Sequence, residues 1–150
     1  MINNEFKFSK VREVKSPKRA NEFDAGIDFF IPEDFKETIL NHSESILIPS
    51  GIKINIPHGY ALIAFNKSGI ASKKSLDIMA SVIDETYQGE IHINLINNGQ
   101  IPQILRPGDK IIQFVLIPML YLQLIEVDMN ELYEIKSSRG GGGFGSTGTK

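Results

Sequence analysis

The chain has 150 residues, of which 41% are hydrophobic and 23% are charged, with a formal net charge of −2 and no cysteine. This composition predicts one soluble domain with a sizeable core, and the near-neutral charge argues against a broad nucleic-acid-binding surface. The lack of cysteine excludes disulfides and thiolate metal sites, and no apolar stretch reaches the roughly 18 residues that would predict a membrane span. We therefore expect a cytoplasmic or otherwise intracellular protein that binds neither nucleic acid nor membrane.

Apolar and polar residues alternate along much of the chain, a period of two that is typical of half-buried strands. The first element expected is a short helix over 33–40, and a short helical turn is expected at 68–74. Strands are predicted, in chain order, at 46–48, 52–56, 60–65, 91–95, 111–117 and 120–127. Clusters of proline, asparagine and glycine separate these runs and predict turns. Many short strands between regular turns indicate a mostly β barrel or sandwich.

The C-terminal segment 139–148 reads R-G-G-G-G-F-G-S-T-G and cannot build a core. Glycine loses more conformational entropy on ordering than any other residue, so such a tail is commonly a flexible terminus. The alternative is a lid over a nucleotide, in which Arg139, Ser146 and Thr147 contact phosphates and Phe144 stacks on a base. We expect a domain over 1–136 and a flexible glycine-rich arm over 137–150.

Four further glycines lie beside polar residues that a simple turn does not require. They belong to the segments A-G-I-D (25–28), K-S-G (67–69), I-D-E-T-Y-Q-G (83–89) and G-D-K-I-I-Q (108–113). Asp84 follows an apolar pair, where a carboxylate can orient and deprotonate a water, although an Asp there can equally begin a turn. Ser68 and Gly69 can present an anion site, or Ser68 can simply cap a helix.

In order, these four segments and the tail resemble the five motifs of the trimeric dUTP pyrophosphatases, or dUTPases, from Ala25 to Gly148. The resemblance implies a jelly-roll-like β-barrel that hydrolyses dUTP to dUMP and pyrophosphate with Mg²⁺. In that family the reaction limits uracil incorporation into DNA and supplies dUMP for thymidylate synthesis. The Asp that matches Asp84 activates the water that attacks the α-phosphorus, so Asp84 is the expected catalytic residue.

The resemblance also implies how the substrate is held. Asp28 is expected to reach the metal through water, and Tyr87 to pack beneath the deoxyribose and exclude a 2′-hydroxyl. The uracil site is expected from the backbone of the hairpin over 78–92. The full set of expected substrate contacts is Lys67, Ser68, Gly69, Val82, Ile83, Tyr87, His92, Gln113, Arg139, Phe144, Gly145, Ser146 and Thr147.

Three positions depart from the family's motifs. Lys67 and Lys110 stand where arginine is usual, which replaces a planar fork of donors with a point charge. Ser81 stands where glycine usually precedes V-I-D. If that site requires a positive φ, the hairpin backbone must adjust to the serine. Phosphate affinity and uracil binding are the properties that these departures affect.

The resemblance further implies a homotrimer whose active sites are shared between subunits, with the arm closing a neighbour's site. A second hypothesis is a nucleotide-responsive regulatory protein on the same fold. Its partner surface has no readable motif, and the polar segment 41–45 is the first candidate. A third is a dCTP deaminase-like activity, against which the intact I-D-x-x-Y-x-G and F-G-S-T-G segments argue.

Overall fold

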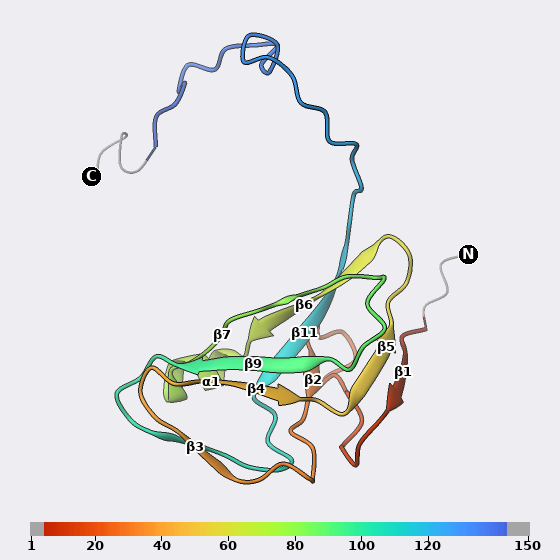
Figure 1. Ribbon diagram of the computed structural model, residues 1–150, viewed down its shortest axis with the longest axis vertical. Coiled ribbons are helices and arrows are strands. Elements are labelled where there is room, and N and C mark those ends of the chain that lie inside the picture. The colour runs from red at the N-terminus through yellow and green to blue at the C-terminus, as the bar shows by residue number, and fades with distance from the viewer. Residues whose placement is uncertain (1–4, 144–150) are drawn as a thin grey trace. The chain divides into compact units, whose positions relative to one another are not determined.

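The computed structural model describes residues 5–143, and within them the fold is mostly β, as the sequence predicts (Figure 1). The one helix of the described chain is α1 (Ser68–Lys74). The strands are β1 (Lys7–Lys10), β2 (Ile27–Phe29), β3 (Thr38–Leu40), β4 (Ser45–Pro49), β5 (Ile52–Asn55), β6 (Tyr60–Asn66), β7 (Leu76–Ile78), β8 (Val82–Ile83), β9 (His92–Asn97), β10 (Gln103–Leu105) and β11 (Ile112–Pro118).

All pairings between these strands are antiparallel. One sheet has four strands in the order β2-β11-β6-β8, and a second has three in the order β4-β9-β7. Two ribbons, β1-β5 and β10-β3, complete the arrangement (Figure 1). The long strands β6 and β11 pair along their whole length, from Ile112 opposite Asn66 to Pro118 opposite Tyr60.

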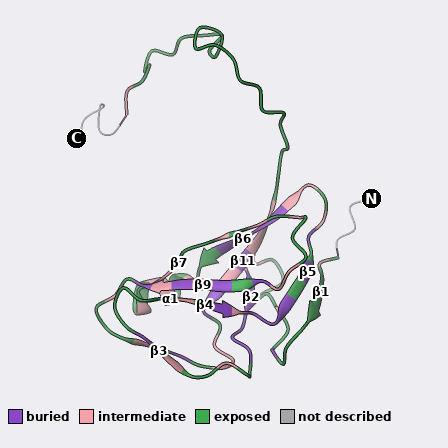
Figure 2. Cartoon of the chain, in the orientation of Figure 1, coloured by how far each residue is buried: buried purple, intermediate pink, exposed green. Residues whose placement is uncertain are grey.

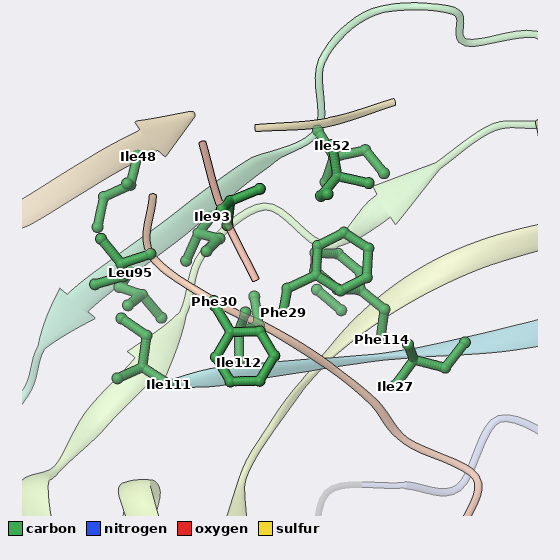
Figure 3. Packing of buried hydrophobic residues seen from close by; sticks show 14 of the residues in the cluster. Ile27, Phe29, Phe30, Ile48, Ile52, Ile93, Leu95, Ile111, Ile112 and Phe114 are labelled. Carbon is green, nitrogen blue, oxygen red and sulfur yellow. The ribbon is translucent and has the colours of Figure 1, made fainter. Parts of the chain in front are cut away.

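The core consists of the inward-facing apolar residues of both sheets (Figure 3). Phe29 of β2 and Phe114 of β11 pack with ring centroids 4.5 Å apart and planes tilted by 53°. Ile93 and Leu95 of β9 are essentially without solvent contact, as the alternation of apolar residues along this strand predicts. Burial of these side chains is the main force that holds the sheets together.

The predicted strands at 46–48, 52–56, 60–65, 91–95 and 111–117 correspond to β4, β5, β6, β9 and β11, and the predicted helical turn is α1. The helix expected over 33–40 is wrong. A turn follows Pro32, whose carbonyl accepts from the amide of Phe35, and Thr38–Leu40 forms β3. Register with β10 places Leu40 in the core, so cross-strand pairing outweighs the local helical preference.

The chain divides into two units, Met1–Leu120 and Tyr121–Lys150. The strand predicted over 120–127 is absent from the described structure, and its apolar side chains are exposed (Figure 2). Leu120 is 80% and Leu124 is 96% exposed. Since a strand needs a partner for its hydrogen bonds, and no described strand pairs with this segment, it forms no strand despite its β-forming sequence. No helix among residues 5–143 is long and apolar enough to span a membrane.

Candidate active site

A pocket of about 200 Å³ lies beside β8 and the loop that follows it. Five of the residues that the sequence indicates for substrate binding or catalysis line it: Val82, Ile83, Asp84, Tyr87 and His92. Phe114 of β11 also lines this pocket, so the pocket reaches the buried side of the four-stranded sheet. The structure therefore gathers the third motif around one cavity.

The position of Asp84 follows from the short strand β8. Ile83 pairs with Leu62 and Val82 with Ile63, so Asp84 is the first residue beyond the sheet, and it is exposed. The amide of Tyr87 donates to the Asp84 carbonyl at 3.1 Å and closes a turn. Asp84 thus begins a turn, which is one of the two roles that the sequence allows. Its carboxylate lies outside the core and can act at the pocket.

Ser81 fits the hairpin without backbone strain. Ser43 and Ser75 are the non-glycine residues with a positive φ in the described chain, and Ser81 is not among them. Its carbonyl accepts from the amide of Ala64 at 2.8 Å, which ties the hairpin to β6. Glycine at this position is therefore not needed for backbone conformation in this chain.

Glu85 fixes the loop next to Asp84, a role that the sequence analysis missed. One carboxylate oxygen lies 2.9 Å from Nδ1 of His58, and the other accepts from the amide of Gly59 at 2.7 Å. Gly59 has φ +84° in the turn between β5 and β6, a conformation that favours glycine. The P-H-G sequence at 57–59 predicts only a turn between strands, and nothing local in the sequence shows that this turn holds the loop of Asp84.

Tyr87 lies across Gly89 at the end of the loop. Its hydroxyl donates to the carbonyl of Glu90 at 2.8 Å, and a Cβ on Gly89 would overlap the Tyr87 ring. The glycine two residues after the tyrosine therefore gives the ring its space. Tyr87 is 44% exposed, so one part of its surface is open toward a ligand.

Asp28 is the centre of a second cluster, formed by the first, second and fourth motifs. Its side chain is buried, and its two carboxylate oxygens accept from Nζ of Lys67 and, at 2.9 Å, from Nζ of Lys110. Burial alone would raise the pKa of Asp28, but hydrogen bonds and positive charge from Lys67 and Lys110 outweigh it and hold that pKa below its ordinary value. Both lysines that replace arginines thus converge on one carboxylate.

Gln113 lies beside this cluster. It is opposite Asp28 in the β2–β11 pairing, and its side-chain amide donates to the carbonyl of Asn66 at 2.9 Å. Gly26, Asp28, Lys67 and Gln113 line a second pocket, of about 490 Å³. One bond fixes the amide group, and its second N–H can still donate to an anion.

Ser68 and Gly69 open α1, and both are exposed. Lys67 is the N-cap residue and no side chain caps the helix, so the alternative interpretation of Ser68 as the helix cap is wrong. The reason is that Ser68 is already inside the helix, where its hydroxyl does not face the first free amides. The hydroxyl is therefore not committed to capping.

The residues present fit a magnesium ion only in a limited way. Among residues 5–143, no group of three or more histidine, cysteine or acidic side chains could enclose a metal. Asp28 offers one ionised carboxylate that lines the second pocket, and Mg²⁺ usually keeps several waters and binds substrate phosphates with only one or two carboxylates. This donor set suits an ion carried mainly by a triphosphate.

Arg139 is the part of the fifth motif that the structure describes most fully. It is exposed, and its Nε donates to the carbonyl of Gly142 at 2.7 Å within a local turn. The other tail residues expected to bind substrate, Phe144, Gly145, Ser146 and Thr147, lie outside the described residues.

Comparison with known proteins gives a consistent result. The dUTPase family model matches residues 12–148. A deoxyuridine 5′-triphosphate nucleotidohydrolase of Clostridium acetobutylicum is 40% identical, with 89% of each chain covered. The enzyme of the same name from Mycobacterium sp. (strain JLS) is 37% identical, with 91% of this chain and 90% of the relative covered.

Solved structures agree. The dUTPase of Staphylococcus bacteriophage 80alpha, determined with dUPNHPP, is 26% identical with a TM-score of 0.81, covering 97% of this chain and 99% of the phage chain. A mutant dUTPase from phage phi11 of S. aureus, in which the coordination of a structural Mg(II) ion was described, is 26% identical with a TM-score of 0.74, covering 86% and 100%. The expected jelly-roll-like fold is confirmed, and the chain belongs to the dUTPase family.

Proposed function

We propose that this chain is a dUTP diphosphatase that hydrolyses dUTP to dUMP and pyrophosphate, thereby limiting uracil incorporation into DNA and supplying dUMP for thymidylate synthesis. The observation that carries the proposal is the pocket beside β8, where exposed Asp84 lies at the same cavity as Tyr87 and His92. This cavity combines a base for water activation with an apolar surface that suits a nucleoside.

Asp84 is the catalytic residue in this proposal. Its carboxylate orients a water, accepts its proton and directs the oxygen at the α-phosphorus, and pyrophosphate leaves on the opposite side. The turn closed by Tyr87 and the two bonds that Glu85 makes with the β5–β6 turn hold the carboxylate in place. A fixed base has less conformational entropy to lose when the substrate arrives.

The nucleoside is held by the hairpin. Backbone groups around Val82, Ile83 and His92 read the uracil, and the Tyr87 ring lies beneath the deoxyribose. A ring in contact with C2′ leaves no room for a 2′-hydroxyl, which would reject ribonucleotides. The unstrained backbone at Ser81 supports this use of the hairpin, because the departure from glycine does not distort it.

The triphosphate is held on the side of Asp28. Lys67, Ser68, Gly69 and Gln113 supply positive charge and N–H or O–H donors to its oxygens. Bound Mg²⁺ would neutralise phosphate charge there, with Asp28 holding it through water. The two lysines keep Asp28 ionised, which is the state that such a contact requires.

The two pockets open on opposite faces of one sheet, which supports active sites shared between copies of the chain. Phe114 lines the Asp84 pocket, whereas its neighbours Gln113 and Val115 line the Asp28 pocket. Since successive side chains of a strand point to opposite faces, one nucleotide does not reach both pockets of one chain. A homotrimer, in which the third motif of one subunit faces the Asp28 cluster of another, completes the site.

The arm belongs to the same assembly. Arg139 together with Phe144, Gly145, Ser146 and Thr147 closes over the nucleotide in a neighbouring subunit's site, adds charge stabilisation and excludes bulk water. The exposed apolar residues of 120–127 support an exchanged segment, because a β-forming run without a partner in its own chain can pair with another copy.

Pyrophosphate release from dUTP, dTTP, dCTP and UTP, measured for wild type and Asp84→Asn, tests the proposal. We expect dUTP to be strongly preferred and the substitution to lower kcat by about a thousandfold. Activity that survives Asp84→Asn would refute the role of the base, and equal use of UTP would refute the role of Tyr87. The regulatory alternative is not favoured, because the relatives cited above carry the name of the hydrolase.

A further inference from the structure

Arg12 and Glu90 form an ion pair outside all five motifs. Nε of Arg12 donates to Oε1 of Glu90 at 2.9 Å, and the amide of Gly51 donates to the same oxygen at 2.7 Å. The pair, called here the Arg12–Glu90 clamp, joins the segment after β1, the β4–β5 turn and the chain between Tyr87 and β9. Three segments that are distant in sequence are therefore tied to one carboxylate.

The clamp is better protected than an ordinary surface ion pair. The Glu90 side chain is 17% exposed and the Arg12 side chain 37% exposed. The hydrogen bonds that Arg12 donates to Glu90, chiefly, and to Asp34 raise the pKa of Arg12 above its ordinary value. A charge-assisted bond that is partly shielded from water is stronger than an exposed one, and the backbone N–H of Gly51 adds a second donor.

The backbone carbonyl of Glu90 links the clamp to the sugar side of the pocket. It accepts from the Tyr87 hydroxyl at 2.8 Å and lies 2.9 Å from Nδ1 of His92. Both side chains line the Asp84 pocket. Glu90 thus has its side chain fixed on one side and, through its carbonyl, orients two pocket residues on the other.

We propose that the Arg12–Glu90 clamp positions Tyr87 and so sets how strongly the site rejects ribonucleotides. The proposal rests on the proposed function, because rejection of a 2′-hydroxyl depends on the Tyr87 ring. Exclusion by a ring requires the ring to stay in place when a larger sugar presses on it. The hydroxyl bond to Glu90 supplies that resistance only while Glu90 itself is held.

Glu90→Ala in the full-length protein tests the proposal. We expect the ratio of kcat/KM for dUTP to kcat/KM for UTP to fall by about tenfold, mainly through better use of UTP. Glu90→Gln keeps an acceptor for Arg12 and Gly51 and should restore most of the ratio. Asp34→Asn is the matched control, since it removes the charge of the other partner of Arg12 but leaves the clamp, and its ratio should equal that of wild type.

A second measurement tests the position of the Tyr87 ring without relying on the proposed enzymatic activity. The NMR signal of the Tyr87 ring, assigned with Tyr87→Phe in tyrosine-labelled protein, should shift in Glu90→Ala and stay in place in Asp34→Asn. A clamp with only a structural role would lower thermal stability and leave both the ratio and the ring signal unchanged, and this result would overturn the proposal. Wild type that releases no pyrophosphate from dUTP would instead refute the function while the ring signal still tests the clamp.

Discussion

The side chain of Gln113 lies against Gly26, where a Cβ atom would overlap its amide group. The first and fourth motifs are therefore sterically coupled across the β2–β11 pairing, in which Gln113 also faces Asp28. Gly26→Ala should push the amide away from the Asn66 carbonyl and raise KM for dUTP by about tenfold, because a misplaced donor costs about as much as one lost hydrogen bond to a charged group. Steady-state kinetics measure this.

A double-mutant cycle controls the Gly26 experiment. Gln113→Ala alone should raise KM to a similar extent, and adding Gly26→Ala to it should change little, because the overlapping amide is gone. Additive effects in the double variant would mean that Gly26 acts through something other than Gln113.

Lys67→Ala should destabilise the protein by about 2 kcal/mol, since it removes one of two cations from a buried carboxylate. Lys110→Ala should cost less, because the Lys110 side chain is 44% exposed whereas that of Lys67 is 22% exposed. Urea unfolding without added metal gives both values. Equal losses, or none, would contradict this ranking of Lys67 above Lys110 as a partner of Asp28.

The stability that Asp28 contributes should disappear in acid. Its pKa is lower in the folded protein than in the unfolded chain, so the contribution is complete above the unfolded value near 3.8 and is lost as pH falls through the folded value. Asp28→Asn should therefore lower the free energy of unfolding at pH 7, and the gap to wild type should narrow below about pH 4. A gap that stays constant from pH 7 to pH 3 would show that the ionised pair is not its source.

Glu85→Ala should lower kcat by about tenfold with little change in KM, because the loop that carries Asp84 loses its bonds to the β5–β6 turn. His58→Ala is the matched comparison and should have a small effect. The His58 side chain is 88% exposed, and exposed ion pairs contribute little, whereas the bond from the Gly59 amide remains. A larger effect from His58→Ala would reverse this ranking of the two contacts.

Local patterns predict the strands well because alternation records which face is buried. Ile52 and Ile54 of β5, and Ile93 and Leu95 of β9, point into the core as their spacing indicates. Among the strands that local patterns do not predict, β3 and β10 are each three residues long, and each depends on the other for pairing. No local signal in the sequence reports a partner that lies far along the chain.

The candidate site shows the same division. Candidate site residues could be named from the sequence, and five of them meet at one pocket. Two supporting contacts could not be predicted from the sequence, that of Glu85 with His58 and that of Glu90 with Arg12. They join residues that are 27 and 78 positions apart. Such contacts form only when the folded chain brings distant segments together, and a glutamate next to a turn gives no signal of its own in the sequence.

Deletion from Arg139 onward should leave the proposed trimer folded but nearly inactive. The described part of the arm makes only local bonds, such as that from Arg139 to Gly142, and its apolar neighbours before Arg139 remain in the truncated chain. We expect kcat to fall by at least about a hundredfold, since charge stabilisation and exclusion of water act mainly in the transition state, while binding of a non-hydrolysable dUTP analogue weakens less. Kinetics, calorimetric titration and sedimentation on the same samples separate these effects.

Arg139→Lys in the full chain is the matched variant, because it keeps the charge and the arm but loses the planar fork. Its activity should lie between that of wild type and that of the deletion variant. Normal turnover in the deletion would contradict the lid, whereas loss of the oligomer would show that the segment acts in assembly instead.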